Sequence, residues 1–251
     1  MNHALVTGAG SGIGAVIAVT LAQAGYRLSL LGRRQEPLLE TAASAPPESC
    51  QTLSCDVGNI EDVEKAFATA TESFGPVDVL VNCAGVAPTA PFHKLSGEQW
   101  QAVLNTNLNG VFNCTSQVIG SMRERQGGRI INIASTASLK GYAYVSAYCA
   151  AKHGVLGLTR ALALETAELG ITVNAICPGY TDTDIIRQSV QQIVDKTGRS
   201  EEQALSQFTN TNPQGRLIQP DEIAGTVMWL CSEAARSVTG QAISISGGET
   251  M

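Results

Sequence analysis

The sequence has little positive charge and no long apolar run. Its 251 residues contain 16 Lys and Arg against 22 Asp and Glu, which gives a net charge of -6. Because nucleic-acid affinity depends mainly on clustered cations, this balance argues against a nucleic-acid partner. No uninterrupted apolar run approaches the ~18 residues that a membrane span requires, so no membrane partner is expected either.

The seven cysteines are scattered and odd in number, without a close Cys-x-x-Cys pair. This spacing favours neither a zinc site nor a disulfide framework, so no bound metal is expected. The chain runs from Met1 directly into a short apolar segment and a glycine turn, without the basic region and cleavage site of a secretory signal. These features predict a cytoplasmic protein with reduced thiols.

Short apolar runs alternate with longer segments of helical periodicity along the chain. Strands are predicted at residues 3–7, 26–31, 51–55, 78–82, 129–134, 171–176 and 241–245. Helices are predicted at residues 12–24, 35–44, 60–74, 97–124, 145–168 and 220–232. This alternation is typical of βαβ units, so we expect a single α/β domain over residues 1–251. Its doubly wound, seven-stranded parallel sheet should lie between two layers of helices.

Residues 181–220 interrupt this alternation. The stretch is polar, has two weak helical patterns at about 183–195 and 200–208, and contains no predicted strand. It leaves the carboxyl end of the strand at 171–176, the edge of a parallel sheet where ligands bind. Because irregular connections longer than ~12–15 residues commonly have a function, we expect a helical lid over a substrate; a solvated surface excursion is the alternative.

A glycine-rich turn, Thr7-Gly8-Ala9-Gly10-Ser11-Gly12-Ile13-Gly14, joins the first strand to the first helix. Glycines let the backbone approach a diphosphate closely, and the free N–H groups of a helix start favour its negative charge. The candidate phosphate-binding residues are Gly8, Ser11, Gly12, Ile13 and Gly14. Since the turn lacks the Gly-Lys-Ser/Thr ending of a phosphate-transfer loop, it predicts a dinucleotide rather than ATP.

The end of the second strand indicates which dinucleotide is bound. A carboxylate there usually binds the ribose hydroxyls of NAD, whereas Arg accommodates the extra phosphate of NADP. The sequence has Arg33 and Arg34, and no carboxylate before Glu36. Because guanidinium groups offer forked donors to a phosphate, NADP(H) is the preferred cofactor and NAD(H) the alternative. The competing explanation is that both arginines are solvated residues at a helix start.

Ser135, Tyr148 and Lys152 follow the fifth predicted strand with the spacing Ser-x12-Tyr-x3-Lys. Residues four apart on a helix share one face, so the phenol and the ammonium can both point at a carbonyl near the serine. A free phenol, with a pKa of ~10, is a poor base at neutral pH. We therefore expect Lys152, assisted by the positive nicotinamide ring of the oxidised cofactor, to lower the pKa of Tyr148, which would make the phenol an acid and base for proton transfer.

Taken in order, these motifs resemble those of the short-chain dehydrogenase/reductase family. The resemblance runs from Ala4 to Gly248 and adds Asp56, Asn82, Ala84, Gly85, Asn107, Asn174, Pro178 and Gly179 to the residues above. It implies a Rossmann fold, a homotetramer and a nicotinamide-dependent oxidoreductase that interconverts a ketone and a secondary alcohol. One position departs from the family pattern, because Cys83 stands where the family usually has Asn.

The resemblance also implies residue roles on the adenosine side of the cofactor. Asp56 and Val57 would hold the adenine, and Ala84 and Gly85 would touch the adenosine ribose. Asn82 would steady the centre of the sheet.

On the nicotinamide side, Lys152 would bind the ribose, and Asn107 would hold a water that relays protons from Lys152. The residues that would place the carboxamide are Pro178, Gly179, Thr181 and Thr183. The implied catalytic set is Asn107, Ser135, Tyr148 and Lys152.

The second half of the chain is similar to aromatic polyketide ketoreductases and to 3-hydroxybutyrate dehydrogenases. The hydroxybutyrate enzymes grip a small carboxylate with a His and a Lys, where this sequence has Ala137 and Val145. Because the cation is missing, we favour a bulky or aromatic ketone, or a 3-ketoacyl thioester of the CoA type. The alternatives are a hydroxybutyrate-type dehydrogenase and a nucleotide-sensing protein without catalysis.

A 3-ketoacyl group could also arrive on an acidic carrier protein, which basic residues beside the site would attract. Arg123, Arg125 and Arg129 are the candidates for that role. Glu165 and Glu168, at the end of the predicted catalytic helix, weaken this interpretation.

Overall fold

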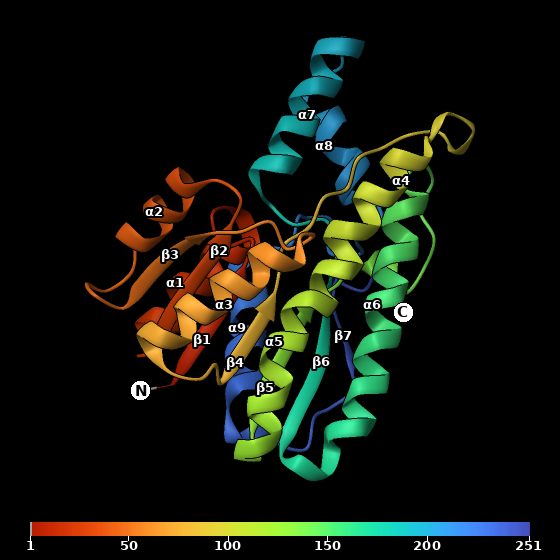
Figure 1. Ribbon diagram of the computed structural model, residues 1–251. Helices are drawn as coiled ribbons and strands as arrows, with labels where there is room; N and C mark the ends of the chain where they lie inside the picture. Colours follow the sequence, from red (N-terminus) through yellow and green to blue (C-terminus); the bar gives the residue numbers. More distant parts are fainter. Residues whose placement is uncertain (1) are drawn as a thin grey trace.

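The computed structural model describes residues 2–251. The strands are β1 His3–Thr7, β2 Arg27–Gly32, β3 Cys50–Ser54, β4 Val79–Asn82, β5 Gly128–Ile133, β6 Ile171–Pro178 and β7 Ala242–Ile245. They form one sheet in the order β3-β2-β1-β4-β5-β6-β7, and every adjacent pair is parallel (Figure 1). The predicted doubly wound sheet is therefore confirmed. Its order reverses between β1 and β4, and such a reversal opens a crevice at the carboxyl ends of parallel strands.

Helices cover both faces of the sheet (Figure 1). They are α1 Gly12–Gln23, α2 Gln35–Ala43, α3 Ile60–Phe74, α4 Gly97–Leu104, α5 Gly110–Arg125, α6 Ser146–Thr166, α7 Asp184–Thr197, α8 Glu201–Thr209 and α9 Pro220–Cys231. On one face, α1, α2 and α9 pack on the strands; on the other, α3, α5 and α6 do. Because the strands are buried on both sides, they read as continuous apolar runs: in β1, Ala4 and Val6 join one core and Leu5 the other.

The prediction of a single continuous helix over 97–124 is wrong in the middle of that range. A π-helical turn at Asn105–Asn109 separates α4 from α5. The side chain of Asn107 is fully buried there, and its Nδ2 donates to Val103 O and to Val86 O, both at 2.9 Å. Since helical periodicity continues on both sides of the turn, the sequence pattern does not reveal it.

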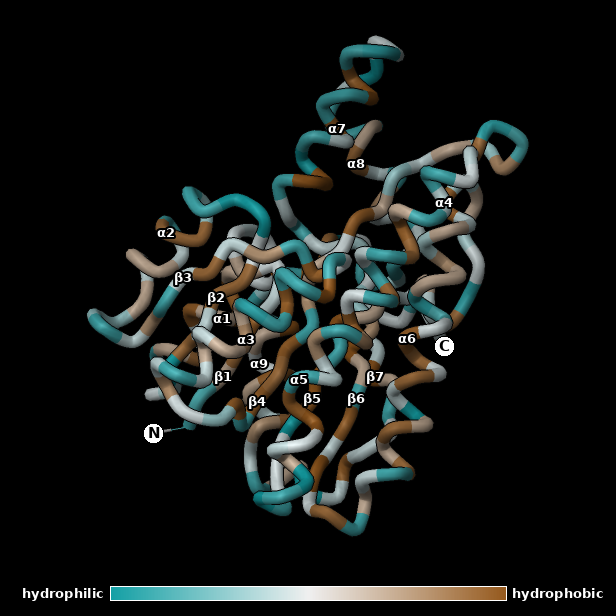
Figure 2. Tube along the Cα trace, in the orientation of Figure 1, coloured by the Kyte–Doolittle hydropathy of each residue, from teal (hydrophilic) through white to brown (hydrophobic). Residues whose placement is uncertain are grey.

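The 181–220 insertion contains α7 and α8, which pack against each other above the carboxyl ends of the strands (Figure 1). These helices coincide with the two weak patterns predicted there. The base of the insertion is pinned where its two ends meet, because Asp182 N donates to Ile218 O at 2.8 Å and Ile218 N to Tyr180 O at 2.9 Å. Along α7 the chain is mostly hydrophilic, and Val190 is its buried residue (Figure 2).

Over residues 2–251, no helix is both long enough and apolar enough to cross a membrane.

His3 at the start of β1 carries a buried, titratable ring. Its Nδ1 lies 2.7 Å from Gly75 O and its Nε2 lies 2.8 Å from Ser29 Oγ, which itself accepts a hydrogen bond from Gln51 Nε2 at 2.8 Å. A carbonyl oxygen can only accept, so the network fits a neutral ring with its proton on Nδ1. Burial lowers the pKa of His3 below its ordinary value of 6.5.

This burial predicts a loss of stability in acid. Below pH 6.5 the unfolded chain takes up a proton on His3 that the folded chain resists, so the free energy of unfolding falls as the pH drops. His3→Gln should therefore lose less stability than the wild type between pH 7.5 and 5.5, as measured by urea midpoints. His153→Gln, at an exposed ring, is the matched control. Equal pH dependence in His3→Gln and the wild type would contradict this assignment.

Candidate active site

The glycine-rich turn between β1 and α1 lies against the end of β4. A Cβ at Gly8 would be 2.8 Å from Ala84 Cα, and a Cβ at Gly14 would overlap the carbonyl oxygen of Gly8. Gly8 and Gly12 also have φ angles of 67° and 53°, which side chains disfavour. Thr7 ties the turn in place, because its Oγ1 accepts hydrogen bonds from the N–H of Ala84 and from that of the preceding residue, at 3.1 and 3.0 Å.

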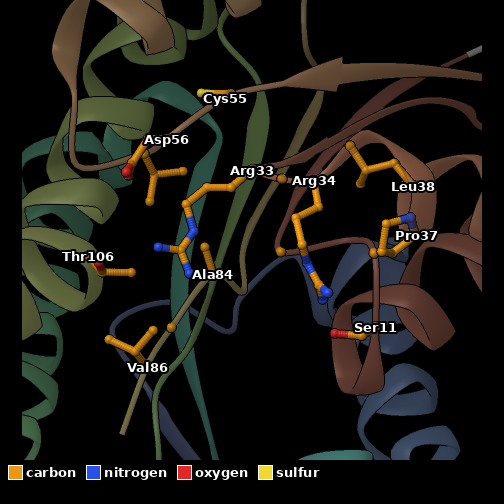
Figure 3. A pocket seen from close by; sticks show the side chains of 15 residues that line it. Ser11, Arg33, Arg34, Pro37, Leu38, Cys55, Asp56, Ala84, Val86 and Thr106 are labelled. Atoms are coloured by element: carbon orange, nitrogen blue, oxygen red, sulfur yellow. The ribbon is translucent and has the colours of Figure 1, made fainter. Parts of the chain in front are cut away.

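A pocket opens beside this turn, at the carboxyl ends of β1, β2 and β4 (Figure 3). It is lined by Gly8, Gly10, Ser11, Gly32, Arg33, Arg34, Pro37, Leu38, Cys55, Asp56, Val57, Ala84, Gly85, Val86 and Thr106. The structure thus brings together most of the predicted phosphate and adenosine residues; Gly12, Ile13, Gly14 and Asn82 lie outside the lining. The lining residues that were not among the predicted site residues are Gly10, Gly32, Pro37, Leu38, Cys55, Val86 and Thr106. Two of these residues could have been predicted from the sequence, because Leu38 closely follows the arginines and Cys55 directly precedes Asp56.

The two arginines extend into this pocket from the end of β2, and Arg34 points toward Ser11 (Figure 3). Within residues 2–251, neither guanidinium forms an ion pair with a carboxylate. Their charge is therefore available to an anion in the pocket. Close approach of the backbone, a helix start and free guanidinium donors together fit a phosphate-bearing dinucleotide.

Asp56 lies across the pocket from Ser11 of the glycine turn, and Val57 also lines the pocket (Figure 3). Asp56 Oδ1 accepts a hydrogen bond from Gly58 N at 2.9 Å, and Val57 O accepts one from Asn113 Nδ2 at 2.9 Å. These bonds fix the loop after β3 against α5. Asn82 serves the sheet rather than the pocket, because its Nδ2 donates to Asn132 Oδ1 at 2.9 Å.

Two of the four predicted catalytic residues, Lys152 and Asn107, are tied to the carboxyl ends of β5 and β4. Lys152 Nζ donates to Ile133 O at 2.7 Å, and Asn107 Oδ1 accepts from Val86 N at 3.2 Å. A Cβ at Gly85 would lie 2.8 Å from Asn107 Oδ1 and 3.8 Å from Lys152 Nζ. The side chains of Asn107 and Lys152 therefore both lie against Gly85, and a side chain at that position would not fit.

Tyr148 lies on the first turn of α6, one turn before Lys152. The Lys152 ammonium is 5.7 Å from the centroid of the Tyr148 ring. Burial raises the pKa of Tyr148 above its ordinary value of 10, and hydrogen bonding by Ser135 opposes that rise. Burial also lowers the pKa of Lys152, to about 8.

In the protein without a cofactor, the pKa of Tyr148 is therefore shifted in the direction opposite to that expected beside an oxidised cofactor. Desolvation of the phenolate is the largest cause of this shift. A raised pKa keeps the phenol protonated at neutral pH, and a protonated phenol can donate.

The segment after β6 connects this site to the insertion. Gly179 N donates to Ile245 O at 3.0 Å, and Thr181 Oγ1 donates to Gly179 O at 3.0 Å. A Cβ at Gly12 would lie 3.2 Å from Thr183 Cγ2. The start of α7 therefore lies directly over the glycine turn, where the predicted carboxamide residues could reach a bound dinucleotide.

A second, aromatic pocket lies under the insertion. It is lined by Thr89, Ala90, Pro91, Tyr142, Ala143, Tyr144, Val145, Tyr180, Gln207 and Phe208. Tyr142 and Tyr144 belong to the loop that precedes α6. Tyr180 and Phe208 were missed because they follow β6 and lie in α8, and nothing local in the sequence indicates that they meet the loop before α6.

The basic residues suggested for a carrier protein lie at the wrong edge of the sheet. Arg125 pairs with Asp78, and Arg129 lies 3.8 Å from Glu233 and donates to Gly170 O. These positions adjoin the amino ends of β4 and β5, whereas both pockets lie at the carboxyl ends. The structure therefore does not support docking of an acidic carrier through them.

A family model described as short chain dehydrogenase matches residues 2–194. The chain is 42% identical over 250 residues to an acetoacetyl-CoA reductase of Shinella zoogloeoides, covering 98% of this chain and 97% of the relative. It is 37% identical over 248 residues to a D-beta-hydroxybutyrate dehydrogenase of Cupriavidus necator, covering 98% and 96%. A crystal structure of an actinorhodin polyketide ketoreductase variant with NADPH matches with a TM-score of 0.94 and 42% identity, covering 99% and 97%. The chain therefore belongs to the short-chain dehydrogenase family, as its motifs predicted.

Proposed function

We propose that the protein is an NADP(H)-dependent oxidoreductase that interconverts a ketone and a secondary alcohol. The observation that carries this proposal is the convergence of Ser135, Tyr148 and Lys152 at the end of β5. A phosphate-compatible pocket and an aromatic pocket lie at the same edge of the sheet. Intact acid and base groups at this position argue against a protein that only senses nucleotides.

The bound cofactor supplies the hydride, and the chain positions the carbonyl and moves the proton. Ser135 donates a hydrogen bond to the carbonyl oxygen, and Tyr148 transfers its phenolic proton to the same oxygen. Because burial keeps Tyr148 protonated, the protein alone is prepared for reduction. Lys152, with a pKa of about 8, can release a proton near neutral pH and restore the phenol; Asn107 would hold the water of that relay.

The arginines at the end of β2 support NADP(H) over NAD(H). Arg33 and Arg34 line the pocket, and the matched ketoreductase structure contains NADPH. In this arrangement the residues that hold the diphosphate are Ser11, Gly12, Ile13 and Gly14, and those that hold the adenosine are Asp56, Val57, Ala84 and Gly85. The carboxamide would lie against Pro178, Gly179, Thr181 and Thr183.

The aromatic pocket supports a ring-containing ketone or a 3-ketoacyl thioester as substrate. Val145 lines this pocket, and Ala137 is buried in the turn after β5, so neither supplies a cation or a polar group for a small carboxylate. This difference weighs against a hydroxybutyrate-type dehydrogenase, although one relative has that name. The 181–220 insertion would act as the lid of this pocket.

Exposed apolar side chains support a homotetramer. Phe112 on α5 is 59% exposed, Leu164 on α6 is 84% exposed, and Trp229 on α9 is 43% exposed. Apolar groups on the outer faces of three helices suit pairing between copies of the chain. The cytoplasmic location stays a prediction.

Removal of the Tyr148 hydroxyl tests the mechanism. Tyr148→Phe should lose at least ~10²-fold in turnover, because the proton donor is gone, while NADPH binding remains. Turnover is followed by NADPH absorbance with a panel of aromatic ketones and 3-ketoacyl-CoA esters, and binding by NADPH fluorescence. Tyr26→Phe, at the amino end of β2, is the control and should keep its turnover. Unchanged turnover in Tyr148→Phe would refute the mechanism.

Removal of the arginines tests the cofactor. Arg33→Ala with Arg34→Ala should raise the KM for NADPH by about 10- to 100-fold, the scale for lost hydrogen bonds to a charged group, and should leave the KM for NADH nearly unchanged. Arg123→Ala, far from the pocket, is the control. If the wild type saturates at a lower concentration of NADH than of NADPH, the choice of NADP(H) is wrong.

A further inference from the structure

A buried carboxylate in the C-terminal tail lies behind the aromatic pocket. The Glu249 side chain is 1% exposed, and its Oε1 lies 3.1 Å from Lys140 Nζ and 2.6 Å from the Tyr142 hydroxyl oxygen. Carboxylates are almost never buried unless they are paired. None of the roles proposed above uses this carboxylate.

The hydrogen bonds around Tyr142 have one consistent direction. The Tyr142 hydroxyl lies 2.7 Å from Thr136 Oγ1 as well as 2.6 Å from Glu249 Oε1. The phenol has one proton and an ionised carboxylate can only accept, so Tyr142 donates to Glu249 and the Thr136 hydroxyl donates to the phenol oxygen. Lys140 Nζ also lies 5.0 Å from the centroid of the Tyr142 ring. The ring is therefore held by three side chains.

Tyr142 forms one end of a row of aromatic rings that reaches the insertion. Its ring contacts Tyr180 edge to face, with centroids 6.3 Å apart, and Tyr180 contacts Phe208 of α8 in the same way at 5.2 Å. All three rings line the aromatic pocket. The position of Tyr142 therefore affects both the fixed wall of the pocket and the helix above it.

The tail that carries Glu249 is itself wedged between two parts of the site. Gly247, with φ +59°, lies so close to Asn212 that a Cβ would overlap the Asn212 amide, and a Cβ at Gly248 would be 3.2 Å from Pro213 Cγ. On the other side, a Cβ at Gly179 would be 3.1 Å from Glu249 Oε2. The tail thus contacts the returning end of the insertion and the end of β6, which leaves Glu249 little freedom to move.

We propose that Glu249 is a positioning residue that sets substrate preference by holding Tyr142 in the pocket wall, so that ring-containing ketones are favoured over short acyl groups. The inference rests on the proposed function, since it concerns the same pocket. A ring system would lie along Tyr142, Tyr180 and Phe208, whereas a short acyl chain would reach Ser135 and Tyr148 without touching them. Burial raises the pKa of Tyr142 above its ordinary value, which keeps its hydroxyl a donor to Glu249.

The test compares Glu249→Leu and Tyr142→Phe with the wild type on two substrates, a bicyclic aromatic ketone and a four-carbon 3-ketoacyl-CoA. For the bicyclic ketone, kcat/KM should fall about tenfold in either variant, mainly through KM, which is the scale for one hydrogen bond to a charged group. For the short thioester it should change less than about twofold. The double variant should fall no further than either single variant, because both break the same contact. Glu233→Gln, which neutralises an exposed carboxylate elsewhere, is the control.

Equal losses on both substrates, or additive losses in the double variant, would overturn the proposal, and so would unchanged kinetics in folded Glu249→Leu.

If the wild type reduces neither ketone, the proposed function fails. Hydrogen exchange then tests the positioning role of Glu249 separately. The N–H of Ala90 donates to the carbonyl oxygen of Tyr144, two residues after Tyr142, at 2.8 Å. This amide should exchange faster in Glu249→Leu than in the wild type or Glu233→Gln. Equal exchange would overturn the positioning role.

Discussion

The hydrogen bond from Lys152 Nζ to Ile133 O fixes the geometry on which the proposed chemistry depends. It joins the first turns of α6 to the end of β5, so the phenol of Tyr148 lies close to Ser135. Lys152 is 4% exposed, and burial of an ammonium without partners would be strongly unfavourable. The carbonyl of Ile133 gives the ammonium a hydrogen-bond partner, and burial lowers the pKa of Lys152 from 10.5 to about 8. The arrangement that places the ammonium therefore also makes its proton available near neutral pH.

A ladder of polar side chains holds the same helix against the sheet from within. Asn82 on β4 donates to Asn132 on β5 at 2.9 Å, Asn132 donates to Thr159 on α6 at 2.8 Å, and Thr159 donates to the Val155 carbonyl at 2.8 Å. Buried amides without partners would cost about 1–3 kcal/mol each, so such a ladder favours one register of α6 over β5. An apolar interface would allow the helix to slide, and Tyr148 would then lose its position beside Ser135.

Local patterns were sufficient to predict the sheet and the glycine turn, because each depends on neighbouring residues. The spacing of Ser135, Tyr148 and Lys152 was likewise sufficient to predict that their side chains come together. The π-helical turn around Asn107 was not predictable, because it depends on Val86, which lies in a different segment. The backbone N–H of Val86 donates to the Asn107 side chain and its carbonyl oxygen accepts from it, and these contacts exist only in the folded chain. The sign of the Tyr148 pKa shift was missed for a similar reason. Spacing shows that an ammonium is near, but only the fold shows how much water is excluded from the phenol.

The two pockets differ in what shapes them, and this difference explains why the cofactor was easier to predict than the substrate. The nucleotide pocket depends on close backbone approaches at Gly8 and Gly14, which tolerate no side chain and so leave a glycine signature in the sequence. The aromatic pocket depends on side chains from three distant segments, represented by Tyr142, Tyr180 and Phe208, and on a C-terminal carboxylate behind them. No short sequence motif indicates that these side chains come together. A change at one of these positions could alter the substrate without disturbing the chemistry at Tyr148, so substrate preference can diverge among relatives that share the same glycine turn.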